Sequence, residues 1–253
     1  MSKPIVPWLG GKRRMAKHIL PLINDDHQTY VEPFAGGAAM FFMKEQSKVE
    51  VINDVNSDLV NLYRVVRHHL DELIRHFRWS LISREDYLLA NETDPKTLTD
   101  IQKAARFYFL QRMSFGAKVK GRVFGVAPST PPKFNLTRIE EDLSQAHMRL
   151  ARTYIENLPW DKCIERYDRN GTMFYLDPPY WGTEGYGVDF EFSNYERMAE
   201  LARTIKGRMV ISVNDIPEMQ HVFDGLDIQR INLKHTVGGK GGVSRGELII
   251  KSW

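Results

Sequence analysis

The 253-residue sequence has little cysteine, no long apolar run and almost no net charge. Its one cysteine, Cys163, cannot form an internal disulfide and fits no metal cluster. No stretch approaches the ~20 consecutive apolar residues that cross a bilayer, and the opening MSKPIVPWLGGKRR lacks the apolar segment of a signal peptide. These absences favour a cytoplasmic globular protein with no membrane partner and no bound metal, and no sequence feature indicates an obligate protein partner.

Acidic residues are absent from one long stretch, although the whole chain is nearly balanced, with 35 Lys and Arg against 32 Asp and Glu. Between Ile101 and Ile139 the basic residues are Lys103, Arg106, Arg112, Lys118, Lys120, Arg122, Lys133 and Arg138, with aromatic residues interleaved. Glycines and the turn sequence PSTPP favour a basic β-hairpin or loop laid against phosphates. The alternative is a solvated basic face with a few core aromatics. A second acid-free run carries Lys240 and Arg245 and is typical of a mobile loop.

A glycine turn lies between two strand patterns near the N-terminus. The segment TYVEPFAGGAAMFF predicts a strand over Thr29–Glu32, a turn at Gly36 and Gly37, and a helix that begins at Ala38. A second strand, Val49–Asp54, follows and ends on an acid. This order is typical of a Rossmann-like sheet, in which the turn approaches the ligand and the acid binds ribose hydroxyls. Because the turn reads FAGGA rather than GxGxxG, a nucleoside ligand fits better than a dinucleotide; an ordinary strand–helix turn is the alternative.

Residues 56–150 have mainly helical patterns. DLVNLYRVVRHHLDELIRHF places apolar residues at helical spacing. Thr99 with Gln102, and Thr137 with Glu140, fit the capping box that begins a helix. We interpret this segment as a separate, mainly helical domain.

Strand patterns return after residue 151, at TMFYLD, RMVISVND, LDIQRINL and ELIIKSW, with a helix near Asn194–Ile205. Strands on both sides of a helical segment predict an α/β fold. A single catalytic sheet would be formed by residues 1–55 and 151–253, with residues 56–150 inserted between its halves. The spacing of the closing strands predicts an antiparallel edge.

The segment MFYLDPPY, residues 173–180, ends a buried strand on an acid and a rigid turn. Asp177 falls at the carboxyl end of the strand, where open α/β sheets bind their ligands. Pro178 and Pro179 offer carbonyls on a fixed backbone, and Tyr180 offers a planar ring beside them. Acceptors next to a ring suit a planar aromatic amine, whose lone pair becomes available when its hydrogens are bound. A plain Pro-Pro turn with a capping Asp is the alternative.

Six motifs follow one another along the chain: PWLGGK at 7–12, VEPFAGG at 31–37, INDVNSDLVN at 52–61, DPPY at 177–180, VISVND at 210–215 and the closing GELII. Together they resemble the Dam-type DNA adenine methyltransferases over nearly the full length. The resemblance implies a Rossmann-like S-adenosylmethionine-dependent methyltransferase sheet. It also implies that the inserted domain, with its basic hairpin, recognises the target in double-stranded DNA.

The resemblance also assigns residues. The catalytic motif maps onto Asp177, Pro178, Pro179 and Tyr180. The cofactor-binding residues it implies are Trp8, Gly10, Gly11, Lys12, Glu32, Phe34, Gly36, Gly37, Asp54 and Asp177. The DNA-binding residues expected from the basic segments are Arg112, Ser114, Phe115, Lys118, Lys120, Arg122, Lys133, Lys240 and Arg245. Trp160 is expected to be a packing residue.

The implied reaction is direct transfer of a methyl group from S-adenosylmethionine to the N6 amine of an adenine flipped out of DNA and stacked on Tyr180. Relatives that read GATC carry an Asn-Gly hairpin where this chain has QRMSFGAKVKGRVFGV, so a short or relaxed target site is expected. An RNA adenine methyltransferase, a transferase acting on protein glutamine and a DNA-binding relative without catalysis remain alternatives. The sequence leaves open whether the enzyme belongs to a restriction-modification pair.

Overall fold

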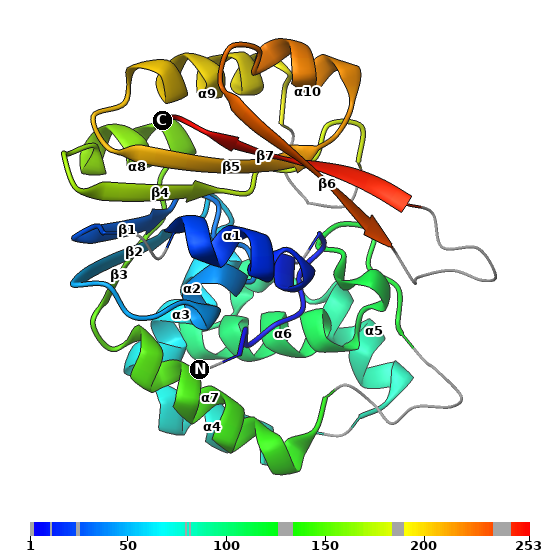
Figure 1. Ribbon diagram of the computed structural model, residues 1–253. Coiled ribbons are helices and arrows are strands. Elements are labelled where there is room, and N and C mark those ends of the chain that lie inside the picture. The colour runs from blue at the N-terminus through cyan, green and yellow to red at the C-terminus, as the bar shows by residue number, and fades with distance from the viewer. Residues whose placement is uncertain are drawn as a thin grey trace.

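The computed structural model describes residues 3–10, 12–23, 26–78, 80, 82–125, 134–183, 190–234 and 244–253. Its centre is a seven-stranded sheet in the order β3-β2-β1-β4-β5-β7-β6 (Figure 1). The strands are β1 (Thr29–Glu32), β2 (Val49–Asn53), β3 (Thr153–Glu156), β4 (Thr172–Leu176), β5 (Arg208–Asn214), β6 (Asp227–Lys234) and β7 (Ser244–Lys251). The Rossmann-like sheet predicted from the sequence is therefore confirmed.

The strands from β3 to β5 are parallel, and β7 pairs antiparallel with both β5 and β6. The predicted antiparallel edge is confirmed. The central strand β4 is buried at every position, as its apolar run predicts. Strand β3 was not predicted from the sequence, because this edge strand is short and half-exposed and has no apolar run.

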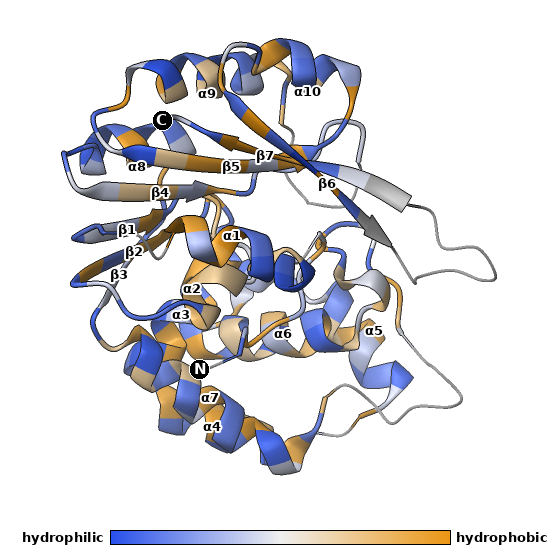
Figure 2. Cartoon of the chain, viewed as in Figure 1, coloured by the Kyte–Doolittle hydropathy of each residue, from blue (hydrophilic) through white to orange (hydrophobic). Residues whose placement is uncertain are grey.

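Helices cover both faces of the sheet (Figure 1). One face packs against α8 (Trp160–Tyr167), α9 (Ser193–Thr204) and α10 (Pro217–Val222). The other face carries η1 (Lys12–Arg14), α1 (Ala16–Ile23), α2 (Ala39–Met43), α3 (Ser57–His68), α4 (Leu70–Phe77), α5 (Arg84–Glu92), η2 (Pro95–Thr97), α6 (Asp100–Met113), η3 (Phe115–Ala117) and α7 (Leu136–Leu150). Figure 2 shows the helices with apolar residues toward the interior and polar residues outside. No helix in these described ranges is long and apolar enough to span a membrane.

The helices between residues 57 and 150 share one continuous hydrophobic cluster with a face of the sheet. Phe107 from α6 and Leu143 from α7 belong to the same cluster as Tyr30, Met173 and Ile249 from the sheet. These helices are therefore fixed against the strands by apolar burial. A boundary between two domains at residues 56 and 150 stays a prediction.

The two predicted capping boxes have different outcomes. Thr99 and Gln102 form the predicted capping box at the start of α6. The predicted box of Thr137 and Glu140 is wrong, because Asn135 caps α7 by accepting a hydrogen bond from the Thr137 amide at 3.1 Å. An Asn two residues earlier leaves Thr137 inside the first turn.

The segment from residue 114 to residue 125, called the basic loop below, follows α6. It contains η3 and one isolated antiparallel bridge, between Ser114 and Phe124. A β-hairpin with paired strands is absent from the part of this segment that is described, so the hairpin prediction is met only by that bridge. Residues 126–133 lie outside the described ranges.

Candidate active site

Three acids meet at the carboxyl ends of the parallel strands. Glu32 ends β1, Asp54 follows β2, and Asp177 follows β4. The register pairs Val31 with both Val51 and Phe174, so the three strands finish at one edge of the sheet. The strand order reverses between β1 and β4, and ligands of open α/β sheets bind at such a reversal. The topology therefore predicts a binding site where the Gly36 turn and Asp177 face each other.

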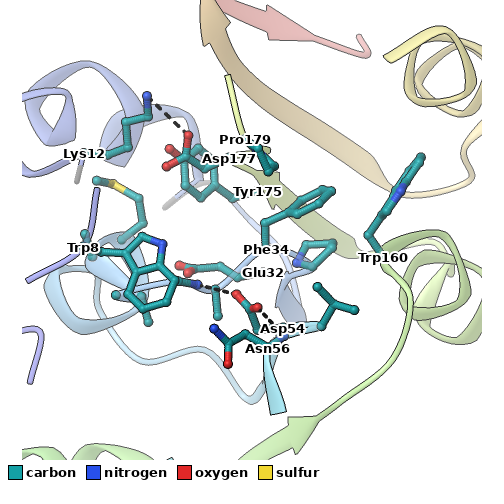
Figure 3. Close-up of a pocket in the computed structure, with 18 of the residues that line it drawn as sticks. Trp8, Lys12, Glu32, Phe34, Asp54, Asn56, Trp160, Tyr175, Asp177 and Pro179 are labelled. Carbon is teal, nitrogen blue, oxygen red and sulfur yellow. Dashed lines mark hydrogen bonds and ion pairs between the residues drawn. The ribbon is translucent and has the colours of Figure 1, made fainter. Parts of the chain in front are cut away.

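A cavity of about 860 Å³ occupies this position (Figure 3). Its walls come from the N-terminal segment, the three strand ends, the start of α8 and Arg112 of α6. The predicted cofactor residues that line it are Trp8, Lys12, Glu32, Phe34, Gly36, Gly37, Asp54 and Asp177. The volume lies within the range of ordinary cofactor pockets.

The turn after β1 needs glycine at position 36. Gly36 has φ +48°, and a Cβ there would lie 2.6 Å from Trp8 Nε1. Its amide donates a 2.8 Å hydrogen bond to Asp54 Oδ2, and its carbonyl accepts one from the Tyr63 hydroxyl at 2.7 Å. The turn is thus held from both sides, against the indole of Trp8, with its backbone open to the cavity.

Asp54 accepts backbone hydrogen bonds with both carboxylate oxygens, one of them from this turn. Oδ2 accepts the Gly36 amide, and Oδ1 accepts the Asn56 amide at 2.8 Å (Figure 3). Burial raises the pKa of Asp54, against the lowering effect of these backbone hydrogen bonds. The Val55 amide also binds this carboxylate, which keeps acceptor capacity for ribose hydroxyls.

Glu32 is almost completely buried beneath the cavity. Its Oε1 accepts hydrogen bonds from the Tyr30 hydroxyl at 2.7 Å and from the Phe41 amide at 2.6 Å. Burial raises the pKa of Glu32 to about 8, although both hydrogen bonds act in the opposite direction. The carboxyl is therefore largely protonated at neutral pH, even though Lys44 also lowers its pKa.

Asp177 is held by contacts to a single oxygen. Ser212 Oγ donates to Oδ1 at 3.2 Å, and Lys12 Nζ lies 3.3 Å from the same atom. No hydrogen bond from the described residues reaches Oδ2. Burial raises the pKa of Asp177 to about 6, against the attraction of Lys12 and in the same direction as repulsion by Glu247. At pH 7 and above, Asp177 is therefore a carboxylate that is oriented through Oδ1 and has Oδ2 available to accept a hydrogen bond.

The two residues after Pro178 are also fixed by side chains. The Tyr195 hydroxyl of α9 donates a hydrogen bond to the Pro179 carbonyl. The Tyr180 hydroxyl donates to Glu247 Oε2, and Lys12 Nζ lies 3.9 Å from the centre of the Tyr180 ring. Pro178 is buried, and neither Pro178 nor Tyr180 lines the cavity. Both prolyl carbonyls were predicted to be open acceptors. The Pro179 carbonyl already accepts a hydrogen bond from Tyr195, so this prediction is limited to the Pro178 carbonyl.

Aromatic side chains form the opposite wall. The rings of Phe34 and Trp160 are stacked with centroids 5.8 Å apart, and Trp160 Nε1 donates to Asn194 Oδ1 at 2.9 Å. Val55, next to Asp54, lines the cavity with 54% of its surface exposed. Trp160 was expected to be a packing residue, and it both packs and lines the cavity. Apolar walls beside an acid suit a nucleoside whose base is flat and whose ribose is polar.

The groups that line the cavity fit S-adenosylmethionine. The absence of a side chain at position 36 leaves a cradle against Trp8 that a Cβ would fill. Carboxyl groups of Glu32, Asp54 and Asp177 surround it, which suits a ligand that carries a sulfonium and an ammonium group. The apolar wall completes the match.

One predicted cofactor residue from the N-terminal motif, Gly10, does not line the cavity. Gly10 is exposed and has φ +73°, so it turns the chain between Trp8 and the buried Lys12. Gly11 lies outside the described residues. Gln111 of α6 fixes the segment by donating to the Pro7 carbonyl at 3.0 Å.

The predicted DNA-binding residues have different environments. Phe115 is 66% exposed, and Lys118 and Lys120 lie on the basic loop, both exposed. Arg112 is half-buried, 3.3 Å from Asp142, and Arg122 is half-buried over the Phe107 ring. The positions outside the described side chains are Lys133, Lys240 and Arg245; of these, Arg245 has a described backbone in β7.

The prediction that the Ser114 side chain contacts DNA is corrected, because this side chain is buried. Its hydroxyl donates to the Leu110 carbonyl at 2.6 Å and lies 2.9 Å from the Tyr87 hydroxyl. These contacts close the end of α6 and leave no surface for DNA.

Tyr63, Tyr195, Ser212 and Glu247 were given no role from the sequence. Tyr63 follows the apolar spacing of α3, so its pattern indicates a core residue. Ser212 and Glu247 stand in two of the quoted motifs, VISVND and GELII. An acid directly before the apolar run of the closing strand is the signal that could have identified Glu247.

Comparison with known proteins matches residues 8–237 to the D12 class N6 adenine-specific DNA methyltransferases. The Type II methyltransferase M.CviBI of Paramecium bursaria Chlorella virus NC1A is 28% identical over 228 residues, covering 88% of this chain and 87% of that protein. The Type II methyltransferase M1.LlaDCHI of Lactococcus lactis subsp. cremoris is 26% identical, with 97% and 93% covered. The DNA adenine methylase of Haemophilus influenzae is 23% identical, with 93% and 87% covered. The family predicted from the six motifs is thereby confirmed: this chain belongs to the D12 class N6 adenine-specific DNA methyltransferase family.

Proposed function

We propose that this chain transfers a methyl group to the N6 amine of adenine in double-stranded DNA, with Asp177 as the residue that binds the amine. The observation that carries the proposal is the Asp177 carboxylate, fixed at Oδ1 and open at Oδ2, across one cavity from the Gly36 turn. The methyl donor of the family, S-adenosylmethionine, supplies when bound an electrophilic methyl group on a positively charged sulfur.

The residues around the Gly36 turn would bind that donor. Asp54 offers its free lone pairs to the ribose, and Phe34 with Trp160 and Val55 forms the apolar wall for the base. Glu32 lies below, where a bound cation would favour its ionised form. These groups bind and orient the donor, and none of them needs to act as a nucleophile.

The target amine would meet Asp177 from the open side. Asp177 Oδ2 accepts one amine hydrogen, and the Pro178 carbonyl accepts the other, since the Pro179 carbonyl is bound by Tyr195. Binding both hydrogens localises the nitrogen lone pair and aims it at the methyl group. An adenine paired inside a duplex cannot reach this position, so the base would be flipped out, at a cost of a few kcal/mol.

Target recognition would lie in the helical segment between residues 56 and 150. The basic loop carries Lys118 and Lys120 beside the exposed Phe115. Such lysines can bind phosphates, which carry no sequence information, or read a guanine edge. With no Asn-Gly turn in this loop, a short or relaxed site is proposed rather than GATC. A cytoplasmic location is part of the same proposal.

The proposal is tested with Asp177→Asn, which keeps the shape of the side chain and removes its charge. We expect transfer of labelled methyl groups to duplex DNA to fall by at least about 10²-fold, because the amine loses its oriented anionic acceptor. Cofactor binding by calorimetry and DNA binding by fluorescence anisotropy should remain measurable. Turnover near the wild-type rate would refute the catalytic role of Asp177, and transfer to structured RNA in preference to DNA would refute the substrate.

A further inference from the structure

Glu247 is a buried acid directly before the apolar part of β7, Leu248 to Ile250. It is only 5% exposed, and the next three residues of β7, Leu248 to Ile250, are buried in the core on either side of the sheet. A buried carboxylate is strongly destabilising unless other groups compensate its charge. The register pairs Glu247 with Asn214 at the end of β5. Glu247 therefore lies at the same edge of the sheet as Asp177.

Two neighbours among the described residues compensate this charge, and both belong to the active-site motifs. The Tyr180 hydroxyl donates to Glu247 Oε2, and Lys12 Nζ lies 3.4 Å from the same oxygen. Lys12 is 4% exposed and also contacts Asp177 Oδ1 at 3.3 Å. An ammonium group has three N–H donors and can serve both carboxylates at once. Asp177, Lys12, Glu247 and Tyr180 therefore form one connected group from three distant parts of the chain.

This group fixes the two surfaces that the target base would use. Lys12 and Ser212 occupy Asp177 Oδ1, which leaves Oδ2 for the amine. Lys12 Nζ covers one face of the Tyr180 ring at 3.9 Å, and the hydroxyl bond sets the tilt of the ring. A base stacked on Tyr180 would thus use the opposite face.

We propose that Glu247 is a positioning residue for methyl transfer, which orients the Tyr180 ring directly and the Asp177 carboxylate through Lys12. This inference rests on the proposed function, because it assigns the base-binding role to Tyr180 and Asp177. Glu247 does not line the cavity and touches no reacting atom, so its effect passes through these partners. Its negative charge also acts on Asp177, whose pKa is raised chiefly by burial, lowered by Lys12 and raised further by repulsion from Glu247.

The test compares Glu247→Gln with the wild-type enzyme in kcat, in KM for DNA and in pH dependence. Gln can still accept the Tyr180 hydroxyl bond but offers Lys12 no negative charge. We expect kcat to fall by about 10-fold or more, as for a small misplacement of a reacting group, with the affinity for S-adenosylmethionine changed less than about threefold. The groups that face Asp177 are Lys12, Glu32, Tyr175, Ser212 and Glu247. Removing one negative charge among them should shift the acid limb of the kcat profile to lower pH.

Glu50→Gln is the matched control. Glu50 is likewise a buried carboxylate between two cations, with Lys44 Nζ at 2.9 Å and Arg149 on its other side, but it lies away from the cavity. This variant should lower the free energy of unfolding and leave kcat per folded molecule and the acid limb unchanged. If the loss of any buried ion pair lowers kcat and shifts the acid limb, both variants will show these changes equally. That result would overturn the inference.

Tyr180→Phe provides a second route if Glu247→Gln does not fold. It removes only the hydroxyl group at a half-buried position, and we expect a lower kcat with an unchanged affinity for S-adenosylmethionine. Glu247→Asp should recover part of the kcat that Glu247→Gln lacks, because it restores the charge. Wild-type kinetics and an unshifted acid limb in Glu247→Gln, with wild-type transfer intact, would overturn the inference alone. A wild-type protein that transfers no methyl group to DNA adenine would overturn the proposed function, and the inference with it.

Discussion

The carboxyl edge of the sheet and the basic loop carry the two halves of the proposed function, and they are built differently. At the edge, Asp54, Glu32 and Asp177 each accept hydrogen bonds from defined neighbours, and the Gly36 turn is held from both sides. In the basic loop one isolated bridge joins the two ends of the segment, and Phe115 and Lys120 are exposed.

The difference indicates what each region must do. Methyl transfer depends on placing a few atoms within a fraction of an ångström, which rigid strand ends provide. Recognition of DNA depends on adapting to a second surface, and surface loops with long charged side chains do this well. We therefore expect changes at the edge to affect chemistry strongly, and changes in the basic loop to affect mainly DNA affinity.

The variants Gly36→Ala and Gly116→Ala test the difference between the sheet edge and the basic loop most directly. Both glycines have positive φ, +48° and +68°, but a Cβ at Gly36 meets Trp8 at 2.6 Å, whereas a Cβ at Gly116 meets nothing within 4 Å. We expect Gly36→Ala to lower methyl transfer by at least about 10²-fold, since Trp8 or the turn must shift by about 1 Å. Titration calorimetry with S-adenosylmethionine should show the loss of affinity directly.

Gly116→Ala is the control for backbone strain alone. It should cost about 1–2 kcal/mol of local stability, because a Cβ is unfavourable at this φ. The affinity for S-adenosylmethionine should stay at the wild-type value. Equal losses in the two variants would show that strain, rather than the contact with Trp8, controls the cavity.

Much of this edge was predictable, because it depends on local sequence. The strand ends of β1, β2 and β4 follow from apolar runs, and each run is followed by an acid or a glycine turn. The contacts that fix them were not predictable, since Tyr63 reaches Gly36 and Glu247 reaches Tyr180 across long separations in sequence. Periodicity shows that a residue is buried, but not which partner it meets.

The basic loop was predictable in charge and not in structure. Lys120 is exposed as its sequence context indicates, yet Ser114 is buried and Arg122 lies over the Phe107 ring. A run of basic residues gives the sign of a surface, whereas the exposure of each side chain depends on how the loop packs against α6. Composition alone cannot separate these cases.

The second prediction concerns Glu32 and pH in the cofactor-free protein. Its pKa is about 8 when folded and near 4.5 when unfolded, so between these values the folded state binds more protons. Stability therefore falls as pH rises through this window, by about 1.4 kcal/mol per pH unit from this residue. Glu32→Gln removes that dependence and should be increasingly stabilised relative to wild type from about pH 6.5 to about pH 7.5.

Urea unfolding at the two pH values measures the difference. Gln keeps an oxygen to accept the Tyr30 hydroxyl and the Phe41 amide, so the packing below the cavity is retained. A gap between variant and wild type that does not grow with pH would show that Glu32 is already ionised in the folded state.

The third prediction tests the basic loop with the double variant Lys118→Ala and Lys120→Ala. We expect weaker DNA binding, with the slope of log K against log salt reduced by about 0.9 for each phosphate that the protein no longer neutralises, or by about 2 if both lysines bind phosphate. Cofactor affinity should be unchanged. Lys162→Ala, an exposed lysine on α8, should leave the slope as it is. An unchanged slope in the double variant would place the phosphate-binding residues elsewhere.

The smallest effect is expected where the helical segment resumes after the basic loop. Asn135 caps α7 through the Thr137 amide, so Asn135→Ala should lower the free energy of unfolding by about 1 kcal/mol. Glu140→Ala should change it by less than about 0.5 kcal/mol, since Glu140 is an exposed residue outside the cap. Chemical denaturation of both variants separates the two capping schemes. Because α7 carries Leu143 into the core that the sheet shares, this change would weaken the support of the loop without touching the cavity, and kcat with saturating DNA should remain at the wild-type value.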